Sequence, residues 1–243
     1  MLKELIDKFY LDREREKKRE QVKFYISDAG KCPRSIFFSL KHVPKKELEA
    51  ERLRVFDHGD YIQMMIQRPL FSLGIVRAVE VPIRPNEIIS GRADFIISIE
   101  GQPYVVDVKS ISGRLNLEKM KDPKPEHYYQ VQLYLHFFKI QKGILLYVNK
   151  DTQELKEFMF DYDEDLANRI LKWFERLKEK VEKNIVPKRI PDYPHHWQCQ
   201  YCPYREICDI SGAEEMDWNQ LKEKIITQEE KSEHNFSNEK KVK

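Results

Sequence analysis

Gly91-Arg92-Ala93-Asp94-Phe95-Ile96-Ile97 is followed, across a short turn, by Tyr104-Val105-Val106-Asp107-Val108-Lys109-Ser110, and these two apolar runs decide the fold. Their β-branched and aromatic residues predict two strands of a hairpin. Side chains alternate between the two faces of a strand, so Asp107 and Lys109 share a face, and Asp94 can reach the same place from the first strand. Charged groups at the ends of buried strands are unfavourable unless they have a use, so this stretch is where we expect function.

Two carboxylates and an ammonium group on one face indicate a metal site. Carboxylates that share a face repel each other unless a cation lies between them, and hard oxygen ligands favour Mg²⁺ or Mn²⁺. An ammonium group beside such a cation can position the attacking water and offset the charge of a phosphate. The residues therefore predict a phosphodiester-cleaving site. The alternative is an exposed Asp-x-Lys ion pair, which is common on surfaces and weak.

Composition limits the class of protein. The chain has 243 residues, of which 41% are hydrophobic and 35% charged, enough for one substantial core or a core with a small appendage. A net charge of +2 gives no general indication of nucleic-acid binding. No apolar run reaches the roughly 18 residues that cross a bilayer, so we expect a cytoplasmic protein without a membrane partner.

The order of predicted elements gives the fold class. Helices are expected over 1–20, 46–67, 126–139 and 163–183, with Pro69 ending the second, and strands over 76–83, 88–99, 104–110, 143–148 and 155–160. This order predicts an α/β (mixed α+β) fold with a mixed β-sheet core flanked by helices. We divide the chain into an N-terminal helical segment (1–45), the sheet core (46–183), a cysteine lobe (184–215) and a charged, disordered tail (216–243).

Four cysteines predict a metal centre. Cys199, Cys202 and Cys208 are close in sequence, whereas Cys32 stands alone, and in a cytosolic chain this asymmetry favours a metal or cluster over disulfides. Zinc usually takes two tight pairs, so three cysteines plus one favour a [4Fe-4S] cluster. Zn²⁺ stays open as the alternative, because His196 lies three residues before Cys199 and could be a ligand.

The spacing of several motifs resembles the PD-(D/E)XK nuclease superfamily, specifically its RecB-like branch. The matching residues are Gly91-x-x-Asp94, then Asp107-x-Lys109, then Gln130-x-x-x-Tyr134. The resemblance implies a restriction-endonuclease-like fold. It also implies that Gln130 and Tyr134 orient the catalytic lysine and contact nucleic acid. The metal ligands that it implies are Asp94, Asp107 and the backbone of Val108.

The resemblance extends to the first long helix, with one departure. Phe56, Gly59 and Ile62 match the branch's motif, but Gln63 stands where the branch has a metal-binding histidine. A glutamine amide oxygen is a neutral, hard ligand that suits Mg²⁺, so we expect Gln63 to bind the metal in place of the histidine. Glu80, on the strand before Gly91, is a weaker candidate for the same site and is expected to be a surface residue.

The cysteines sharpen the resemblance. Cys32-Pro33-Arg34 and the three C-terminal cysteines together are similar to the iron–sulfur nucleases of the RecB-like branch, including the CRISPR-associated exonucleases. The resemblance implies a cluster held by Cys32, Cys199, Cys202 and Cys208 that joins the N-terminal segment to the C-terminal lobe. It also implies an Mg²⁺- or Mn²⁺-dependent exonuclease that acts on single-stranded DNA or DNA ends, in CRISPR spacer acquisition or in repair.

Basic and aromatic residues are candidate DNA contacts through phosphate pairing and base stacking. They are Arg34, Arg92, Arg114, Tyr128, Tyr129 and Lys142. The chain has no Gly-rich loop ending in Gly-Lys-Ser/Thr, so any ATP-driven step would need a partner such as a helicase, and CRISPR integrase proteins are the other expected partners. A second hypothesis, motivated by Gln63, is a catalytically weak DNA-binding or assembly subunit.

Overall fold

The computed structural model describes residues 1–17, 20–112 and 117–227. The chain forms two compact units. The sheet unit comprises Met1–Arg19, Lys23–Gly30 and Glu47–Trp173, and the cysteine unit comprises Glu20–Val22, Lys31–Lys46 and Phe174–Lys243. These units divide the chain at different residues from the four predicted segments, and each is built from three separate stretches of sequence.

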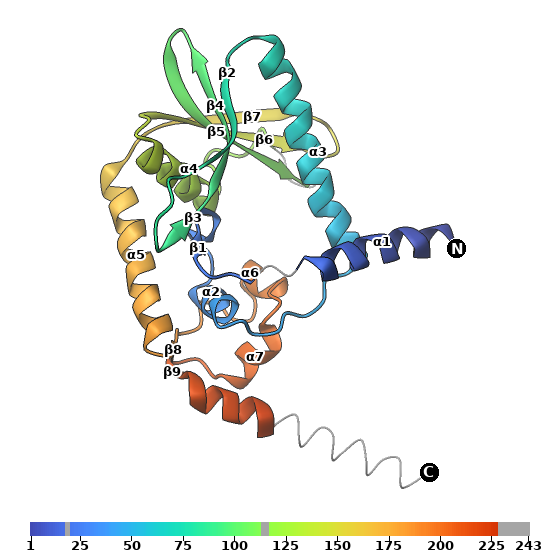
Figure 1. Ribbon diagram of the computed structural model, residues 1–243, viewed down its shortest axis with the longest axis vertical. Coiled ribbons are helices and arrows are strands. Elements are labelled where there is room, and N and C mark those ends of the chain that lie inside the picture. Colours follow the sequence, from blue (N-terminus) through green and yellow to red (C-terminus); the bar gives the residue numbers. More distant parts are fainter. Residues whose placement is uncertain (18–19, 113–116, 228–243) are drawn as a thin grey trace. The chain divides into compact units, whose positions relative to one another are not determined.

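A five-stranded mixed sheet forms the centre of the sheet unit, which confirms the predicted fold class (Figure 1). Its strands lie in the order β2, β4, β5, β6, β7, with bounds Val76–Pro82, Arg92–Ile99, Gln102–Ile111, Lys142–Asn149 and Leu155–Asp161. Only β5 and β6 pair in parallel, and the other neighbouring pairs are antiparallel. A parallel pair needs a crossover connection, and α4 (Pro125–Phe138) provides it.

Helices cover both faces of this sheet. The helix α3 (Ala50–Ser72) places Ile62 and Ile66 against Val108 of β5 and Val148 of β6. On the other face α4 packs so closely on β6 that a Cβ atom added to Gly143 would lie 2.6 Å from Val131. Because side chains alternate along β5, Val108 faces α3 while its neighbours face α4.

The prediction that Pro69 ends the first long helix is wrong. Pro69 lies inside α3, which continues to Ser72. Proline removes one backbone donor, and in the final turn of a helix that loss is small. The backbone N–H of Leu73 still bonds to the carbonyl of Pro69 at 2.9 Å, and Gly74, with φ of +68°, then turns the chain away.

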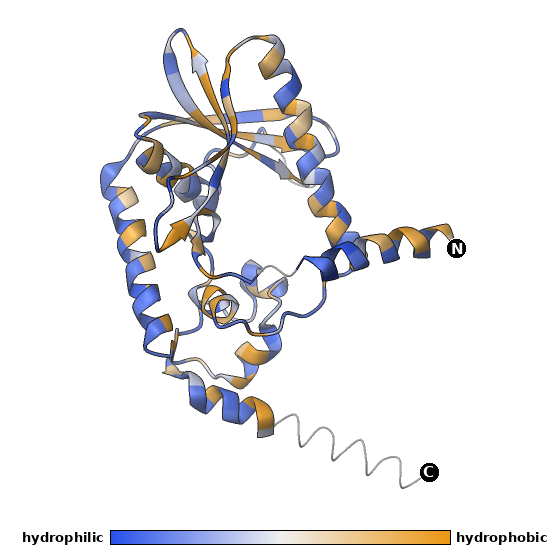
Figure 2. Ribbon diagram, viewed as in Figure 1, coloured by the Kyte–Doolittle hydropathy of each residue, from blue (hydrophilic) through white to orange (hydrophobic). Residues whose placement is uncertain are grey.

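Shorter elements complete the sheet unit. The helix α1 (Leu2–Glu16) is tied to α3 by Tyr10, whose hydroxyl donates to Asp57 at 2.9 Å. After it come β1 (Phe24–Tyr25) and the 3-10 turn η1 (Ile26–Asp28), and β1 pairs in parallel with β3 (Ile89–Ser90). The division between the units falls within α5 (Glu164–Glu182), whose hydrophobic and hydrophilic residues alternate as in an amphipathic helix (Figure 2).

The cysteine unit is built around aromatic side chains. Its elements are α2 (Pro33–Leu40), the end of α5, β8 (Ile185–Val186), α6 (Trp197–Gln200), α7 (Arg205–Ile210), β9 (Met216–Asp217) and a helical stretch over 218–227. Phe37, Phe38 and Tyr204 are buried, with Trp218 packed against the first two. Leu221 is fully buried in the same cluster.

The predicted disorder from residue 216 onward is therefore wrong for 216–227. This segment is charged, but Trp218, Leu221 and Ile225 recur at helical spacing and pack into the core of the cysteine unit. The rest of the predicted tail, 228–243, lies outside the described residues.

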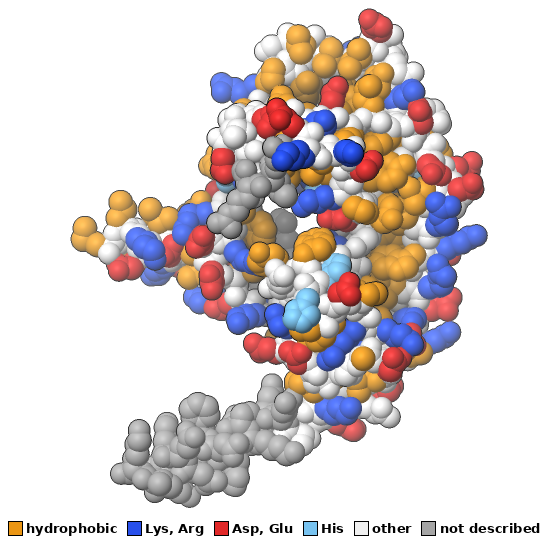
Figure 3. All heavy atoms as spheres, turned by 180° about the vertical axis from the view of Figure 1, so that it is seen from behind, with side chains coloured by type: hydrophobic (Ala, Val, Ile, Leu, Met, Phe, Trp, Pro, Cys, Tyr) orange, Lys and Arg blue, Asp and Glu red, His pale blue; other side chains and the backbone are white. Residues whose placement is uncertain are grey.

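The surface carries both signs of charge. Lys and Arg side chains lie among Asp and Glu side chains on the face shown in Figure 3, in keeping with the small net charge. Within 1–17, 20–112 and 117–227, no helix is long and apolar enough to cross a membrane.

Candidate active site and cysteine cavity

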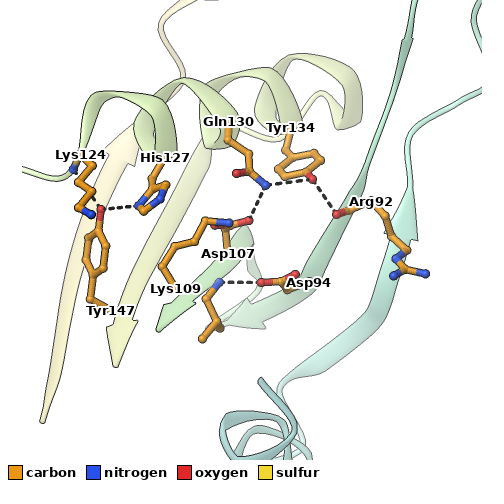
Figure 4. A network of polar contacts seen from close by, with 10 residues as sticks. Arg92, Asp94, Asp107, Lys109, Lys124, His127, Gln130, Tyr134 and Tyr147 are labelled. Atoms are coloured by element: carbon orange, nitrogen blue, oxygen red, sulfur yellow. Dashed lines mark hydrogen bonds and ion pairs between the residues drawn. The ribbon is translucent and has the colours of Figure 1, made fainter. Parts of the chain in front are cut away.

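The two predicted catalytic aspartates meet where β4 and β5 separate. The pairing of these strands ends at Phe95 and Val106, and the next positions in the same register are Asp94 and Asp107. In place of a backbone pair, Oδ2 of Asp94 accepts a hydrogen bond of 2.7 Å from the backbone N–H of Val108 (Figure 4). The end of the ladder thus brings both carboxylates to the face of the sheet that α4 covers.

Lys109 completes the group predicted from the hairpin. Its Nζ lies 2.8 Å from Oδ2 of Asp107, whose side chain is 1% exposed, while 23% of the lysine side chain remains exposed. Apart from this ion pair, Oδ2 of Asp107 is a buried oxygen without a hydrogen bond. Asp94 and Asp107 share this point with one ammonium group, so the residues present fit a cation here.

The charges at this point do not balance. Burial and the neighbouring Asp107 raise the pKa of Asp94 to about 7. Burial also raises the pKa of Asp107, against the opposing effect of Lys109. Burial would lower the pKa of Lys109, but Asp107 and Asp94 outweigh that effect and raise it. One ammonium group thus faces two carboxylates that resist ionising together, an arrangement that a divalent cation relieves.

Gln130 and Tyr134 hold Asp107 in place. The amide Nε2 of Gln130 donates to Oδ1 of Asp107 at 3.1 Å and to the hydroxyl of Tyr134 at 3.3 Å, and that hydroxyl donates to the backbone oxygen of Arg92 at 2.7 Å (Figure 4). Both side chains are buried. Among the described residues, the amide of Gln130 therefore bonds to the aspartate and not to Lys109, and Tyr134, at 2% exposure, is closed to nucleic acid.

His127 lies on the same face of α4 as Gln130, and it was not among the predicted site residues. Its Nδ1 lies 2.8 Å from the hydroxyl of the buried Tyr147, which also accepts the backbone N–H of Lys124 (Figure 4). Burial, together with the positive charges of Lys109 and Lys124, lowers the pKa of His127 to about 3. The spacing of three residues from His127 to Gln130 was the available signal, because such residues share a helix face.

Gln63 is linked through Glu80 to β2, the strand next to Asp94. Its Nε2 donates to Glu80 at 2.6 Å, and the other carboxylate oxygen of Glu80 pairs with Arg92. Glu80 occupies the position opposite Asp94, between the pairs Val79–Phe95 and Val81–Ala93, with φ of +52°. This left-handed backbone is uncommon in a strand and has no signal in the sequence.

The predicted DNA contacts fall into three groups. The prediction that Arg34 contacts DNA is wrong, because its side chain is 1% exposed and cannot reach a phosphate. Arg114 lies outside the described residues. Arg92, Lys142, Tyr128 and Tyr129 keep exposed surface, although Arg92 pairs with Glu80 and Lys142 with Asp161. Their contacts with DNA stay predictions.

All four cysteines line one cavity in the cysteine unit. Cys32 is the N-cap of α2, and it is half-buried beside Cys202 and Cys208. Burial raises the pKa of Cys32 to about 11, so a metal is needed to displace its proton near neutral pH.

The lining of this cavity fits an anionic centre. Arg34, Arg189 and Arg205 line it together with the cysteines, and Nε of Arg189 is buried without a hydrogen-bond partner. Across the described ranges, no three Cys, His, Asp or Glu side chains are close enough to hold a single metal ion. His196 instead caps α6, with its Nδ1 accepting from the backbone N–H of Gln198 at 3.2 Å.

Most of the chain is similar to known exonucleases. The CRISPR-associated exonuclease Cas4 of Saccharolobus solfataricus (strain ATCC 35092 / DSM 1617 / JCM 11322 / P2) is 25% identical over 218 residues, covering 86% of this chain and 98% of that protein. The crystal structure of SSO0001 has a TM-score of 0.55 and 24% identity, covering 86% of this chain and 96% of that one. An alkaline exonuclease from Laribacter hongkongensis has a TM-score of 0.51 and 13% identity, covering 72% and 92%.

A match to a protein family covers most of the chain. Residues 5–209 match the PD-(D/E)XK nuclease superfamily, which is most of the chain and includes both the aspartate pair and the four cysteines. The solved structures share the fold. The chain belongs to the PD-(D/E)XK nuclease superfamily.

Proposed function

We propose that this nuclease is an Mg²⁺- or Mn²⁺-dependent DNA exonuclease that hydrolyses single-stranded DNA or DNA ends. The observation that carries the proposal is the convergence of Asp94, Asp107 and Lys109 at the point where β4 and β5 separate. The strongest support for a cation is that Asp94 and Asp107, two carboxylates at one point, face the single ammonium group of Lys109. The preference for exonucleolytic cleavage draws on the names of its relatives, the Cas4 exonuclease and the alkaline exonuclease.

Each residue has a distinct task in this proposal. Asp94 and Asp107 would hold the divalent ion, with the backbone carbonyl of Val108 and the amide oxygen of Gln63 as further ligands. When bound, the ion supplies Lewis-acid polarisation of the phosphate and activation of water. Lys109, a protonated ammonium group with part of its surface exposed, donates hydrogen bonds to the phosphate or the attacking water.

Gln130 keeps Asp107 oriented for this task. Because one proton of its amide goes to Oδ1, the aspartate is held with Oδ2 directed to Lys109 and to the ion site. Tyr134 in turn fixes the amide by accepting its second proton. Partners of this kind normally raise metal affinity by orienting the ligand.

A nuclease assay with a matched control tests the proposal. End-labelled single-stranded and blunt duplex DNA are incubated with Mn²⁺ or Mg²⁺ and with wild type, Asp107→Asn or Lys109→Ala. Glu157→Gln is the control, because it removes a carboxylate from β7 of the same sheet, where the side chain is exposed. We expect release of mononucleotides by wild type and the control, and loss of about 10³-fold or more in the two site variants.

The outcome also decides between nuclease and binding subunit. If wild type, Asp107→Asn and Lys109→Ala are equally inert in both metals but bind DNA with equal affinity, the catalytically weak DNA-binding or assembly subunit is the better description. Internal cuts without terminal release would keep the nuclease and overturn the exonuclease.

We further propose that Cys32, Cys199, Cys202 and Cys208 hold a [4Fe-4S] cluster rather than Zn²⁺. Four sulfurs around one cavity, with arginines in its lining and without His196, suit a polynuclear anionic centre better than one ion. Gln198 already accepts the backbone N–H of Cys32 at 2.6 Å across 166 residues of sequence, and the cluster would fasten the same segments.

Elemental analysis after anaerobic purification tests the cluster. We expect about four iron and four sulfide per chain and a broad visible absorbance, as four cysteine ligands to one cluster require. Zinc without iron or sulfide would overturn this assignment. The cellular setting we propose is CRISPR spacer acquisition or DNA repair, with integrase proteins or a helicase as partners, supported by the name of the Cas4 relative.

A further inference from the structure

Arg34 is a buried cation for which the described residues provide no anionic partner. Its side chain is 1% exposed, and no carboxylate lies within ion-pair distance in 1–17, 20–112 or 117–227. Its guanidinium donates instead to neutral groups: the backbone oxygens of Pro187, Gly212, Ala213 and Glu214, and the hydroxyl of Ser211. Hydrogen bonds to carbonyls satisfy the donors of a guanidinium but do not neutralise its charge.

The sixth acceptor of Arg34 is a cysteine. Its NH1 lies 3.5 Å from Sγ of Cys208, one of the four cysteines of the cavity. A second arginine has a similar position, because Arg189 lines the cavity, donates to the backbone of Cys208 and Asp209, and keeps Nε buried without a partner. Two arginines that are not exposed thus line the same cavity, and Nε of Arg189 has no hydrogen-bond partner.

We propose that Arg34 and Arg189 are the counter-charges of the metal centre, with Arg34 donating to the sulfur of Cys208 and Arg189 using its free Nε. The inference rests on the cluster proposed above and adds the residues that stabilise its charge. Cysteine sulfurs bind metals as thiolates, so four of them give the centre a net negative charge in a site that water reaches poorly. In such a site the two arginines interact with that charge far more strongly than surface cations do.

The reduction potential of the cluster measures this interaction directly. Gain of one electron makes the centre more negative, so a nearby cation favours the reduced form, and hydrogen bonds to the sulfurs act in the same direction. Removing the charge of Arg34 should therefore make the potential more negative. If Arg34 only holds the carbonyls of 212–214, its replacement would loosen the unit and leave the reduction potential unchanged.

Three variants separate charge from structure, with potentials measured by optical titration of the anaerobically purified full chain. Arg34→Gln removes the charge and Arg34→Lys keeps it while losing the planar fork. Arg205→Gln is the matched control, because Arg205 lines the same cavity with an exposed side chain. We expect a more negative potential and faster loss of visible absorbance with a chelator in Arg34→Gln, a smaller change in Arg34→Lys, and the wild-type potential in Arg205→Gln.

Each other outcome has a definite meaning. An intact cluster with the same potential in wild type and Arg34→Gln overturns the counter-charge role and leaves the cluster proposal standing. Equal shifts in Arg34→Gln and Arg205→Gln also overturn it, because burial would then not matter. Wild type with zinc and no iron overturns both proposals. If Arg34→Gln does not fold, Arg189→Gln replaces it, with a more negative potential expected and an unchanged one overturning the role.

Discussion

Gln63 donates a hydrogen bond of 2.6 Å from its Nε2 to Oε1 of Glu80. This contact fixes the orientation of the amide, because a carboxylate can only accept and the nitrogen must face it. The amide oxygen of Gln63 consequently points away from Glu80 and is the atom left for a cation. The second oxygen of Glu80 pairs with Arg92, so one carboxylate holds both a candidate metal ligand and a candidate DNA contact.

Releasing Arg92 from Glu80 should strengthen DNA binding. In Glu80→Gln the guanidinium, 65% exposed, loses its ion pair and becomes free to bind a phosphate. We expect tighter binding of single-stranded DNA, about 3- to 10-fold at low salt, with a steeper salt dependence. Fluorescence anisotropy in Ca²⁺ measures it. In the Arg92→Gln background the gain should disappear, and a gain of equal size there would show that Arg92 is not the contact.

The stability of the metal-free protein should fall as pH rises from about 4 to 7. The pKa of Asp94 is 3.8 in an unfolded chain and about 7 in the fold, so the folded state binds more protons in this range. Stability then decreases with pH, by up to about 1.4 kcal/mol per pH unit for one group. Urea denaturation in EDTA should show this slope for wild type relative to Asp94→Asn, whose amide can still accept from Val108.

Divalent metal should reverse this trend, because it binds the ionised carboxylates. We expect the rise in melting temperature caused by Mn²⁺ to be larger at pH 8 than at pH 6 in wild type, and to be absent in Asp94→Asn. A difference between wild type and Asp94→Asn that is flat across pH 4–8 would contradict the shifted pKa.

Loss of the Gln130 amide should reduce activity and metal affinity together. Gln130→Leu leaves Oδ1 of Asp107 without its donor, and we expect a 10- to 100-fold decrease in Mn²⁺ affinity, measured by calorimetry. Tyr134→Phe should have a smaller effect in the same direction, because the tyrosine acts only through the amide. The double variant should match Gln130→Leu alone.

Gln132 provides the control for this experiment. It lies on the same helix and is also buried, but it bonds to the backbone of Asp161 and Asp163, away from the aspartate pair. Gln132→Leu should lower stability and leave Mn²⁺ affinity unchanged. An equal loss of affinity in both leucine variants would show that general damage to α4, and not the bond to Asp107, is responsible.

The close approach of α4 to β6 predicts an unusual response to a single methyl group. In Gly143→Ala the new Cβ would lie 2.6 Å from Val131, so the helix must shift, and we expect a loss of about 1–3 kcal/mol in urea denaturation. Val131→Ala should restore part of this loss in the double variant. Gly59→Ala is the control, because its nearest neighbour is 3.6 Å away and the helix should gain up to about 1 kcal/mol.

The sequence predicted the sheet and its aspartates because these depend on short-range patterns. Period-two alternation placed Asp107 and Lys109 on one face, and the spacing to Asp94 followed from the hairpin. The role of Glu80 depends on a backbone angle, and the burial of Arg34 on segments more than 150 residues away, so neither left a local pattern. Charge alone suggested an exposed Arg34 and disorder over 216–227, and tertiary packing overrode both.

The three-part composition of the cysteine unit determines when it can form. Cys32 and α2 are synthesised early. The remaining stretch of their unit begins only at Phe174. The sheet, in contrast, is complete once β7 ends at Asp161. A growing chain can therefore fold its sheet unit on the ribosome before the rest of the cysteine unit is synthesised, and the proposed metal centre would form only after that. Under the cluster proposal, cells short of iron would accumulate a protein whose sheet is folded and whose cysteine unit is not.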